Sequence, residues 1–213
     1  IDRVSETTKF NETYLLKGNN GSTKNVYMKG HDAGLKGTLT DSAKSATFVM
    51  DDLKAGDKIT IAGKEYTIGS TVAEAQALVT DNKTTNGDKI TVNGKEYTSD
   101  GTDYKDADSN VLGAIAAGDV VTRGTTTLTA MTDAKDTAGK NTPDGIDDDD
   151  SSIISKAVAE TKITAELTAA NNIGTVDHAA TVTKAAANGK TTYTITKGYA
   201  TVADTLSFNL HVG

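Results

Sequence analysis

The chain has 213 residues and a net charge of −7, with no cysteine, no tryptophan and a single proline. The lack of cysteine excludes a disulfide framework and a thiolate metal site. The acidic balance argues against nucleic acid as a partner, because phosphate contacts need clustered Lys and Arg. No apolar stretch approaches the roughly 20 residues that cross a bilayer as a helix, so we expect no membrane partner either.

Both ends of the chain contain a short strand-like segment, residues 13–17 and residues 207–212. If these segments pair antiparallel, they form a two-strand stem that carries everything between them as an insertion. Such an insertion needs its ends close together in space. The sequence therefore predicts a stem made of residues 1–18 together with residues 204–213.

A near-duplicate organises the first half of the chain. The stretch Gly56–Thr67, GDKITIAGKEYT, recurs 31 residues later as Gly87–Thr98, GDKITVNGKEYT. In each copy apolar residues alternate with polar ones, which predicts a half-buried strand. A two-residue turn follows, Ala62-Gly63 in the first copy and Asn93-Gly94 in the second, and it predicts a hairpin in each.

Two helices are expected to link these hairpins. Residues 70–79 place apolar side chains on one helical face, and Thr71 with Glu74 forms a capping box at their start. Residues 108–117 are a second helix candidate, which the following glycine would end. A degenerate third hairpin is expected over residues 119–128.

The chain changes character after the third hairpin. Residues 131–150 are small, polar and without a hydrophobic pattern, which is typical of a loop or linker. The aspartates of residues 147–150 precede an apolar run that begins near Ser151, and acidic residues suit a helix N-terminus. How far that helix runs stays open, because residues 163–167 alternate like a strand but also fit a helix face. A last hairpin is expected within residues 180–196.

These elements predict an α+β, β-rich fold of antiparallel β-hairpins with short packing helices, inserted through a two-strand stem. Residues 19–130 would form an outer domain of hairpin–helix repeats, and residues 131–150 an acidic linker. Residues 151–203, a helix plus a hairpin, would be a second outer subdomain or a continuation of the first.

The acidic run offers candidate metal ligands. Asp144, Asp147 and Asp149 could supply oxygen atoms to calcium. The run lacks the EF-hand order, however, in which alternating aspartates are followed by glycine and then by a glutamate at the twelfth position. A solvated loop before a helix explains the same residues and is the interpretation we prefer. We therefore predict no metal site.

Motifs for catalysis are missing from the sequence. None of the histidines begins an HExxH zinc motif, and neither a GxSxG nucleophile elbow nor a GxxxxGK[ST] phosphate loop is present. We predict no catalytic residues, no cofactor and no enzymatic activity. Tyrosines in the hairpin returns could form a ligand-binding stripe, although half-buried packing is their more common role. The residues weighed in this way are His31, His178 and His211, and Tyr66, Tyr97 and Tyr193.

The two ends carry the most specific signals. Residues 1–11 read IDRVSETTKFN and residues 206–213 read LSFNLHVG. Both resemble bacterial flagellin: the first run resembles the segment that leaves the N-terminal core helices and enters a β-hairpin, and the second resembles the strand that re-enters the conserved core. The family commonly has Gly after this Phe-Asn pair, whereas the chain has Glu12, a difference that concerns the local turn.

The resemblance implies that the chain is the variable outer region of a flagellin, with short flanks of its conserved core hairpin. Such a region is an extracellular structural part of the flagellar filament, and it sets the filament's surface and antigenic properties. Its partners would be other flagellin subunits, mostly through regions outside this chain, with host surfaces and antibodies as further candidates. We expect this piece alone to be monomeric. The alternatives are an adhesin-like module that binds glycans or a host protein, and a part of a filament-cap protein.

Overall fold

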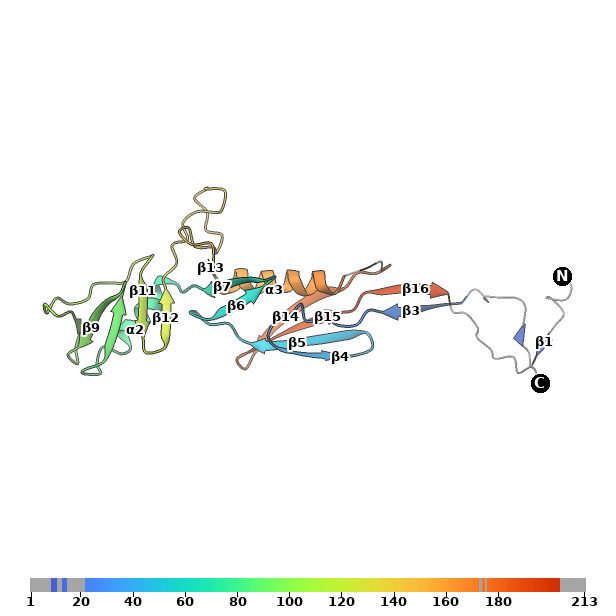
Figure 1. The fold of residues 1–213 in the computed structure, drawn as a ribbon, viewed down its shortest axis with the longest axis horizontal. Helices are drawn as coiled ribbons and strands as arrows, with labels where there is room; N and C mark the ends of the chain where they lie inside the picture. Colours follow the sequence, from blue (N-terminus) through green and yellow to red (C-terminus); the bar gives the residue numbers. More distant parts are fainter. Residues whose placement is uncertain (1–8, 11–12, 15–21, 173, 175, 204–213) are drawn as a thin grey trace.

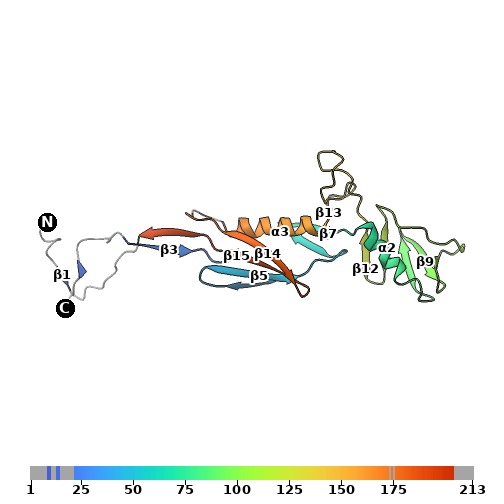
Figure 2. The same ribbon diagram turned by 180° about the vertical axis from the view of Figure 1, so that it is seen from behind.

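The computed structural model describes residues 9–10, 13–14, 22–172, 174 and 176–203. Within them the chain is β-rich, with antiparallel sheets and two helices, as the α+β prediction requires (Figure 1). The described part is elongated. Two views from opposite sides show a ribbon, a proximal body and a distal module following one another along the long axis (Figures 1 and 2).

The ribbon is made of two antiparallel strands, β3 (Thr23–Tyr27) and β16 (Tyr199–Ala203). Tyr27 lies opposite Tyr199, where the ribbon meets the proximal body. Because β3 comes early in the chain and β16 late, their pairing places the start and the end of the body side by side at one narrow end (Figure 1).

The predicted stem lies almost entirely outside the described residues. Within it, β1 (Lys9–Phe10) pairs antiparallel with β2 (Thr13–Tyr14). The pairing of residues 13–17 with residues 207–212 stays a prediction.

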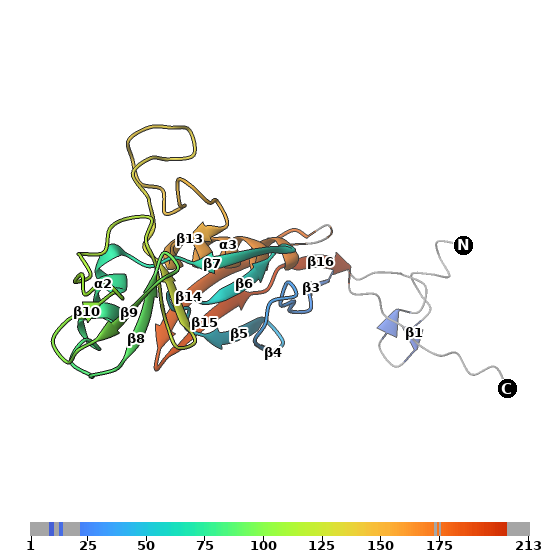
Figure 3. The same ribbon diagram turned by 60° about the vertical axis from the view of Figure 1, so that its left-hand side comes forward.

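The proximal body holds two sheets and the longer helix. An antiparallel sheet has the strand order β14-β15-β5-β4, and a second sheet has the order β13-β7-β6, in which β13 runs parallel to β7. Helix α3 (Lys156–Ala170) contacts strands of both sheets (Figure 3). The strand bounds are β4 (Thr38–Asp41), β5 (Ser45–Asp51), β6 (Lys58–Ile61), β7 (Lys64–Ile68), β13 (Ile153–Ile154), β14 (Thr181–Ala187) and β15 (Lys190–Thr196).

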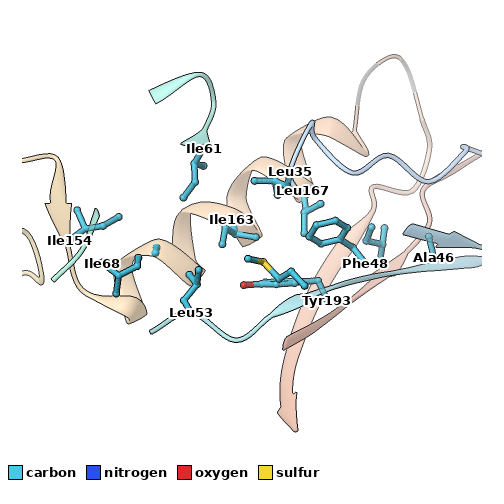
Figure 4. Packing of buried hydrophobic residues seen from close by; sticks show 13 residues of the cluster. Leu35, Ala46, Phe48, Leu53, Ile61, Ile68, Ile154, Ile163, Leu167 and Tyr193 are labelled. Carbon is cyan, nitrogen blue, oxygen red and sulfur yellow. The ribbon is translucent and has the colours of Figure 1, made fainter. Parts of the chain in front are cut away.

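The helix is amphipathic in its packing. Ala159, Ile163 and Leu167 are spaced four residues apart, so their side chains lie on one helix face. All three are fully buried. Figure 4 shows Ile163 and Leu167 directed from the helix toward Phe48 and Tyr193 of the antiparallel sheet. Each large apolar side chain buried in this way contributes about 1.5–3 kcal/mol.

The distal module is a five-stranded sheet with the order β10-β9-β8-β11-β12, packed against helix α2 (Val72–Thr80). Its bounds are β8 (Lys89–Val92), β9 (Lys95–Ser99), β10 (Tyr104–Lys105), β11 (Val120–Arg123) and β12 (Thr126–Thr129). The module has its own core, separate from that of the proximal body. That core consists of Ala75, Val79, Ile90, Val92, Tyr104, Ile115, Val121, Leu128 and Ala130.

The hairpins predicted from the repeat are confirmed. Ala62-Gly63 joins β6 to β7 and Asn93-Gly94 joins β8 to β9, and all four residues have positive φ angles, as a two-residue hairpin turn of this kind requires. The third hairpin is confirmed as well, with Gly124 (φ 58°) in its turn between β11 and β12.

A closing pattern of hydrogen bonds marks the third hairpin as a further copy of the same unit. Gly56 N–H donates to the carbonyl of Ile68, at 2.7 Å. The equivalent bonds, from Gly87 to Ser99 and from Gly118 to Ala130, are 2.8 and 2.7 Å long. The three units thus follow one another at the 31-residue spacing of the sequence repeat.

The predicted helix over residues 108–117 is wrong. This segment contains a turn and a single bridge, from Val111 to Lys105. In a helix the N–H groups of Leu112 and Ile115 would donate to the carbonyls of Asp108 and Val111. They donate instead to the carbonyl of Tyr104 and to Oε1 of Gln76. Ser109 also has a φ of 66°, in the left-handed region that ends a right-handed helix.

The helix expected after the acidic run exists but begins later. Ile153 and Ile154 form β13, and the helix begins after Ser155, whose Oγ accepts a hydrogen bond from the N–H of Val158. Ile163 and Leu167 lie on this helix, so the strand alternative for residues 163–167 is wrong. The preceding aspartates therefore do not lie in its first turn.

The last hairpin, expected within residues 180–196, is confirmed. β14 and β15 pair over seven residues each, from Thr181 opposite Thr196 to Ala187 opposite Lys190. Asn188 and Gly189 form the turn, with φ angles of 53° and 71°.

Candidate functional surfaces

The junction between the ribbon and the proximal body is fastened by a stack of rings. The rings of Tyr27 and Tyr199 lie 5.1 Å apart, and the imidazole of His178 stacks on Tyr199 at 4.3 Å. The backbones of His178 and Tyr199 also exchange two hydrogen bonds, of 3.0 and 3.1 Å. Since each aromatic pair adds about 0.5–1.5 kcal/mol, this stack holds the ribbon to the body more firmly than main-chain pairing alone.

The ribbon itself exposes apolar side chains. Val26 lies opposite Ala200, and Val202 lies opposite Lys24, so both valines are on one face. Val26 is 49% exposed and Val202 is 37% exposed. A two-stranded ribbon is marginally stable by itself. This face is therefore a candidate contact surface for a neighbouring protein.

A charged network crosses the distal module. Arg123 holds Asp88 in a two-point contact, Nε to Oδ2 at 2.9 Å and Nη2 to Oδ1 at 3.0 Å. The hydroxyl of Tyr104 donates to the same carboxylate. Arg123, and then Tyr104, hold the pKa of Asp88 below its usual range. Burial, and then the bond to Asp88, raises the pKa of Tyr104 to about 12. The network ties β11 and β10 to the start of β8.

A second carboxylate, that of Asp106, is buried with only 2% of its side chain exposed. The ammonium of Lys95 lies 2.6 Å from it and is the main cause of its lowered pKa. The backbone N–H groups of Asp108 and Asn110 bind the other oxygen. Both oxygens are thus engaged, and the arrangement braces a loop.

Two open grooves border the proximal body. The larger, of about 850 Å³, lies where the sheet of β4 and β5 meets β6, and its lining includes Lys36, Lys54, Lys58 and Lys190. Lys190 is paired with Asp51 at 2.5 Å. The smaller groove, of about 670 Å³, lies at the N-termini of α2 and α3. Both are open to solvent; the lining of the larger groove is more polar than apolar, and that of the smaller is more apolar than polar.

The calcium candidates lie together in the loop of residues 131–150, which projects from the body (Figure 3). Their oxygens mostly accept hydrogen bonds from the loop's own backbone. Asp147 is buried and accepts from Thr132, Asp149 and Asp150, and Asp144 accepts from Thr137 and Ile146. Across the described residues, no group of three or more His, Asp and Glu side chains is arranged to hold a metal ion.

The other residues weighed from the sequence do not gather into a site. His31 lies near the end of α3, where its backbone N–H donates to Asn171, His178 lies at the ribbon junction, and His211 is outside the described residues.

The tyrosines of the hairpin returns are spread over different sheets and form no stripe. Tyr66 lies in β7 and Tyr97 in β9, each beneath a lysine of its own hairpin. Tyr193 is fully buried in the proximal core, and its hydroxyl has no hydrogen-bond partner among the described residues. Burial raises the pKa of that hydroxyl. The sequence analysis did not find the Asp88 network or the buried Asp106. The residues of each group are separated along the chain and match no motif.

Comparison of the chain with protein-family models, with curated proteins and with solved structures finds no match. No helix in the described part of the chain has the length and apolar character needed to cross a membrane.

Proposed function

We propose that this chain is the outer, variable region of a bacterial flagellin, a structural part of the extracellular flagellar filament. One observation carries the proposal furthest: β3 pairs with β16, so the body begins and ends at the same narrow end. This arrangement is what an insertion into another domain requires, because its two connections must lie side by side. The flagellin-like runs at residues 1–11 and 206–213 lie just beyond these connections in the sequence.

The shape of the described part supports the same role. The repeat hairpins of the distal module lie farthest from the ribbon (Figures 1 and 2). A part that points away from the filament axis would carry the surface charge and the epitopes of the filament. In this module the hairpin of β8 and β9 carries the exposed ion pair of Lys89 with Glu96, which suits contact with water.

The ribbon would connect this outer region to the polymerising core. The exposed face of Val26 and Val202 would then be covered by the core or by a neighbouring subunit in the filament. We do not assign catalysis to the chain, and we propose that it is a monomer when separated from the core.

The test is immunogold labelling of intact source cells with an antibody raised against residues 22–203. We expect gold along the whole filament. Gold only at the filament tip would replace the proposal with a cap protein, and gold on the cell body would favour an adhesin that uses the shallow grooves to bind glycans or a host protein.

The monomer proposal has its own test. Sedimentation of the isolated chain at micromolar concentration should show a single species with the mass of one chain. Filaments or large oligomers under these conditions would contradict it.

A further inference from the structure

The chain contains the dipeptide Asn-Gly at four places, and three of them lie in the described residues, at Asn86, Asn93 and Asn188. All three asparagines are exposed. Asn-Gly is the pair in which the backbone nitrogen of the glycine reaches the side-chain amide carbon of the asparagine most easily, because glycine has no side chain to block the approach. The structure places different restraints on the three pairs.

At Asn93 the side-chain amide is held at both ends. Its Nδ2 donates to Asp119 Oδ1 at 2.7 Å, and its Oδ1 accepts from the N–H of Val120 at 2.9 Å. At Asn86 the attacking nitrogen is held instead, because the N–H of Gly87 donates to the carbonyl of Ser99 at 2.8 Å. Reaction at either pair must first break these bonds.

Asn188 lacks both kinds of restraint. Its side chain has no hydrogen-bond partner among the described residues, and the turn lies at the exposed tip of β14, an edge strand. A Cβ placed on Gly189 would meet no side chain or backbone atom beyond its own chain neighbours. Asn93 occupies the same kind of turn, with φ angles that differ from those of Asn188 and Gly189 by only a few degrees. The two turns thus form a matched pair that differs in the locking of the amide.

We propose that Asn188 is a site of spontaneous deamidation, and that it reacts faster than Asn86 and Asn93 in the folded protein. The nitrogen of Gly189 loses its proton to solvent base and forms a bond to Cγ of Asn188, and the side-chain nitrogen leaves as ammonia. Water then opens the cyclic imide at one of its two carbonyl carbons and gives aspartate or isoaspartate. The sum of these steps converts asparagine and water into a carboxylic acid and ammonia.

The product changes the end of the antiparallel sheet. It adds a negative charge beside the Lys190–Asp51 pair, which borders the larger groove. Isoaspartate also adds a backbone carbon to a two-residue turn that sets the register of β14 with β15. The carbonyl of Gly189 accepts a hydrogen bond from the N–H of Asp52 at 2.9 Å, so the change would reach the neighbouring strand. This inference does not depend on the proposed function.

The experiment incubates the whole chain at mildly alkaline pH and follows each Asn-Gly peptide by mass spectrometry, in buffer and in concentrated urea. In buffer we expect Asn188 to react about ten-fold faster than Asn93, the effect of two hydrogen bonds on the opening of a turn. In urea the three rates should converge. A rate at Asn188 no higher than at Asn93 in buffer, or the same ranking in urea, would overturn the proposal.

A variant provides the matched control. Asp119→Ala removes the acceptor of the Asn93 amide and should raise the rate at Asn93 toward that at Asn188. The rate at Asn86 should not change, because its restraint lies in the bond from Gly87 to Ser99. An unchanged rate at Asn93 with this variant would show that the locked amide is not the cause of the difference.

Discussion

The hairpins β6–β7 and β8–β9 have nearly the same sequence, but they belong to different cores. Ile61 and Ile68 of the first pack in the proximal body, whereas Ile90 and Val92 of the second pack in the distal module. On the side of its first strand, β8 pairs with β11, whereas β6 is an edge strand. Residues within each copy therefore determine that a hairpin forms. A few residues that differ between the copies determine which strands and which core the hairpin packs against.

Two differences stand out. Where the first copy has Ala62, the second has Asn93, whose amide binds Asp119 and Val120 and so holds β11 beside β8. The second strand of the first hairpin ends in Ile68, whereas that of the second hairpin ends in Ser99, whose hydroxyl donates to the carbonyl of Lys83. The apolar side chain of Ile68 thus packs in the proximal core, whereas the polar side chain of Ser99 binds the loop that contains Lys83.

The largest loss of stability is expected when Ile68, at the end of β7, is replaced by the serine found at the equivalent position of β9. Ile68→Ser removes a side chain that is 1% exposed and puts a hydroxyl among apolar atoms. We expect a loss of about 4 kcal/mol in the free energy of unfolding, measured by urea titration. Ile68→Val is the control and should cost only about 1 kcal/mol. Similar losses for the two variants would mean that this position does not attach the hairpin to the proximal core.

The next largest loss of stability is expected at the aspartate in the second position of each copy, Asp57 in the first and Asp88 in the second. Asp88 is paired with Arg123, whereas the side chain of Asp57 accepts a hydrogen bond from the N–H of Lys54 and forms no ion pair within the described part of the chain. Asp88→Asn should cost about 2 kcal/mol at neutral pH, because it weakens hydrogen bonds to a charged group. Asp57→Asn, the matched control, should cost clearly less.

The pH dependence of Asp88 has a definite sign. Its pKa is lower in the folded chain than in the unfolded chain, so its stabilising contribution is complete above the ordinary carboxyl pKa of about 4. The contribution is lost as the pH falls through the lower folded-state pKa. Urea titrations between neutral pH and acid should therefore show a smaller fall in stability for Asp88→Asn than for the natural chain. Parallel curves for the two proteins would contradict the assignment.

The predictions from sequence succeeded where the information is local. The turn at Asn93-Gly94 and the capping box at Thr71 each depend on neighbouring residues, and both are present. The parallel pairing of β13 with β7 and the pairing of β8 with β11 could not be predicted, since they join segments far apart in the chain. The helix expected over residues 108–117 failed because the N–H groups of Leu112 and Ile115 bond to Tyr104 and Gln76, outside the segment, and not to its own preceding turn.

In the candidate sites too, local features could be predicted from the sequence and long-range contacts could not. The acidic run in residues 131–150 was visible in the sequence, but the partners of its carboxylates were not. Asp147 binds Thr132 across the loop, a contact that no spacing rule predicts. Arg123 and Asp88 are 35 residues apart, and only the pairing of β8 with β11 brings their strands together.

The second difference between the two hairpins, Asn93 in place of Ala62, should have a smaller effect on the free energy of unfolding. Asn93→Ala removes two hydrogen bonds to the next unit, and we expect a loss of about 1.5 kcal/mol. Hydrogen exchange should be faster at the amide of Val120, which loses its acceptor. The reverse change, Ala62→Asn, puts the same side chain beside an edge strand and should leave the stability unchanged. Equal effects at both positions would show that the lateral bonds are unimportant.

The smallest expected effect separates the helices of the two regions. In α2 the cap is reciprocal: Thr71 Oγ1 accepts from the N–H of Glu74 at 3.1 Å, and Glu74 Oε2 accepts from the N–H of Thr71 at 2.8 Å. In α3 the cap is one longer bond, from the N–H of Val158 to Ser155 Oγ at 3.3 Å. Thr71→Ala should therefore cost about 1 kcal/mol and Ser155→Ala about 0.5 kcal/mol, both measured by urea titration. The nine-residue helix α2 buries only two of its side chains, so a larger share of its stability must come from its end. A larger loss for Ser155→Ala would mean that α3, although longer, depends more on its cap than on the buried face of Ala159, Ile163 and Leu167.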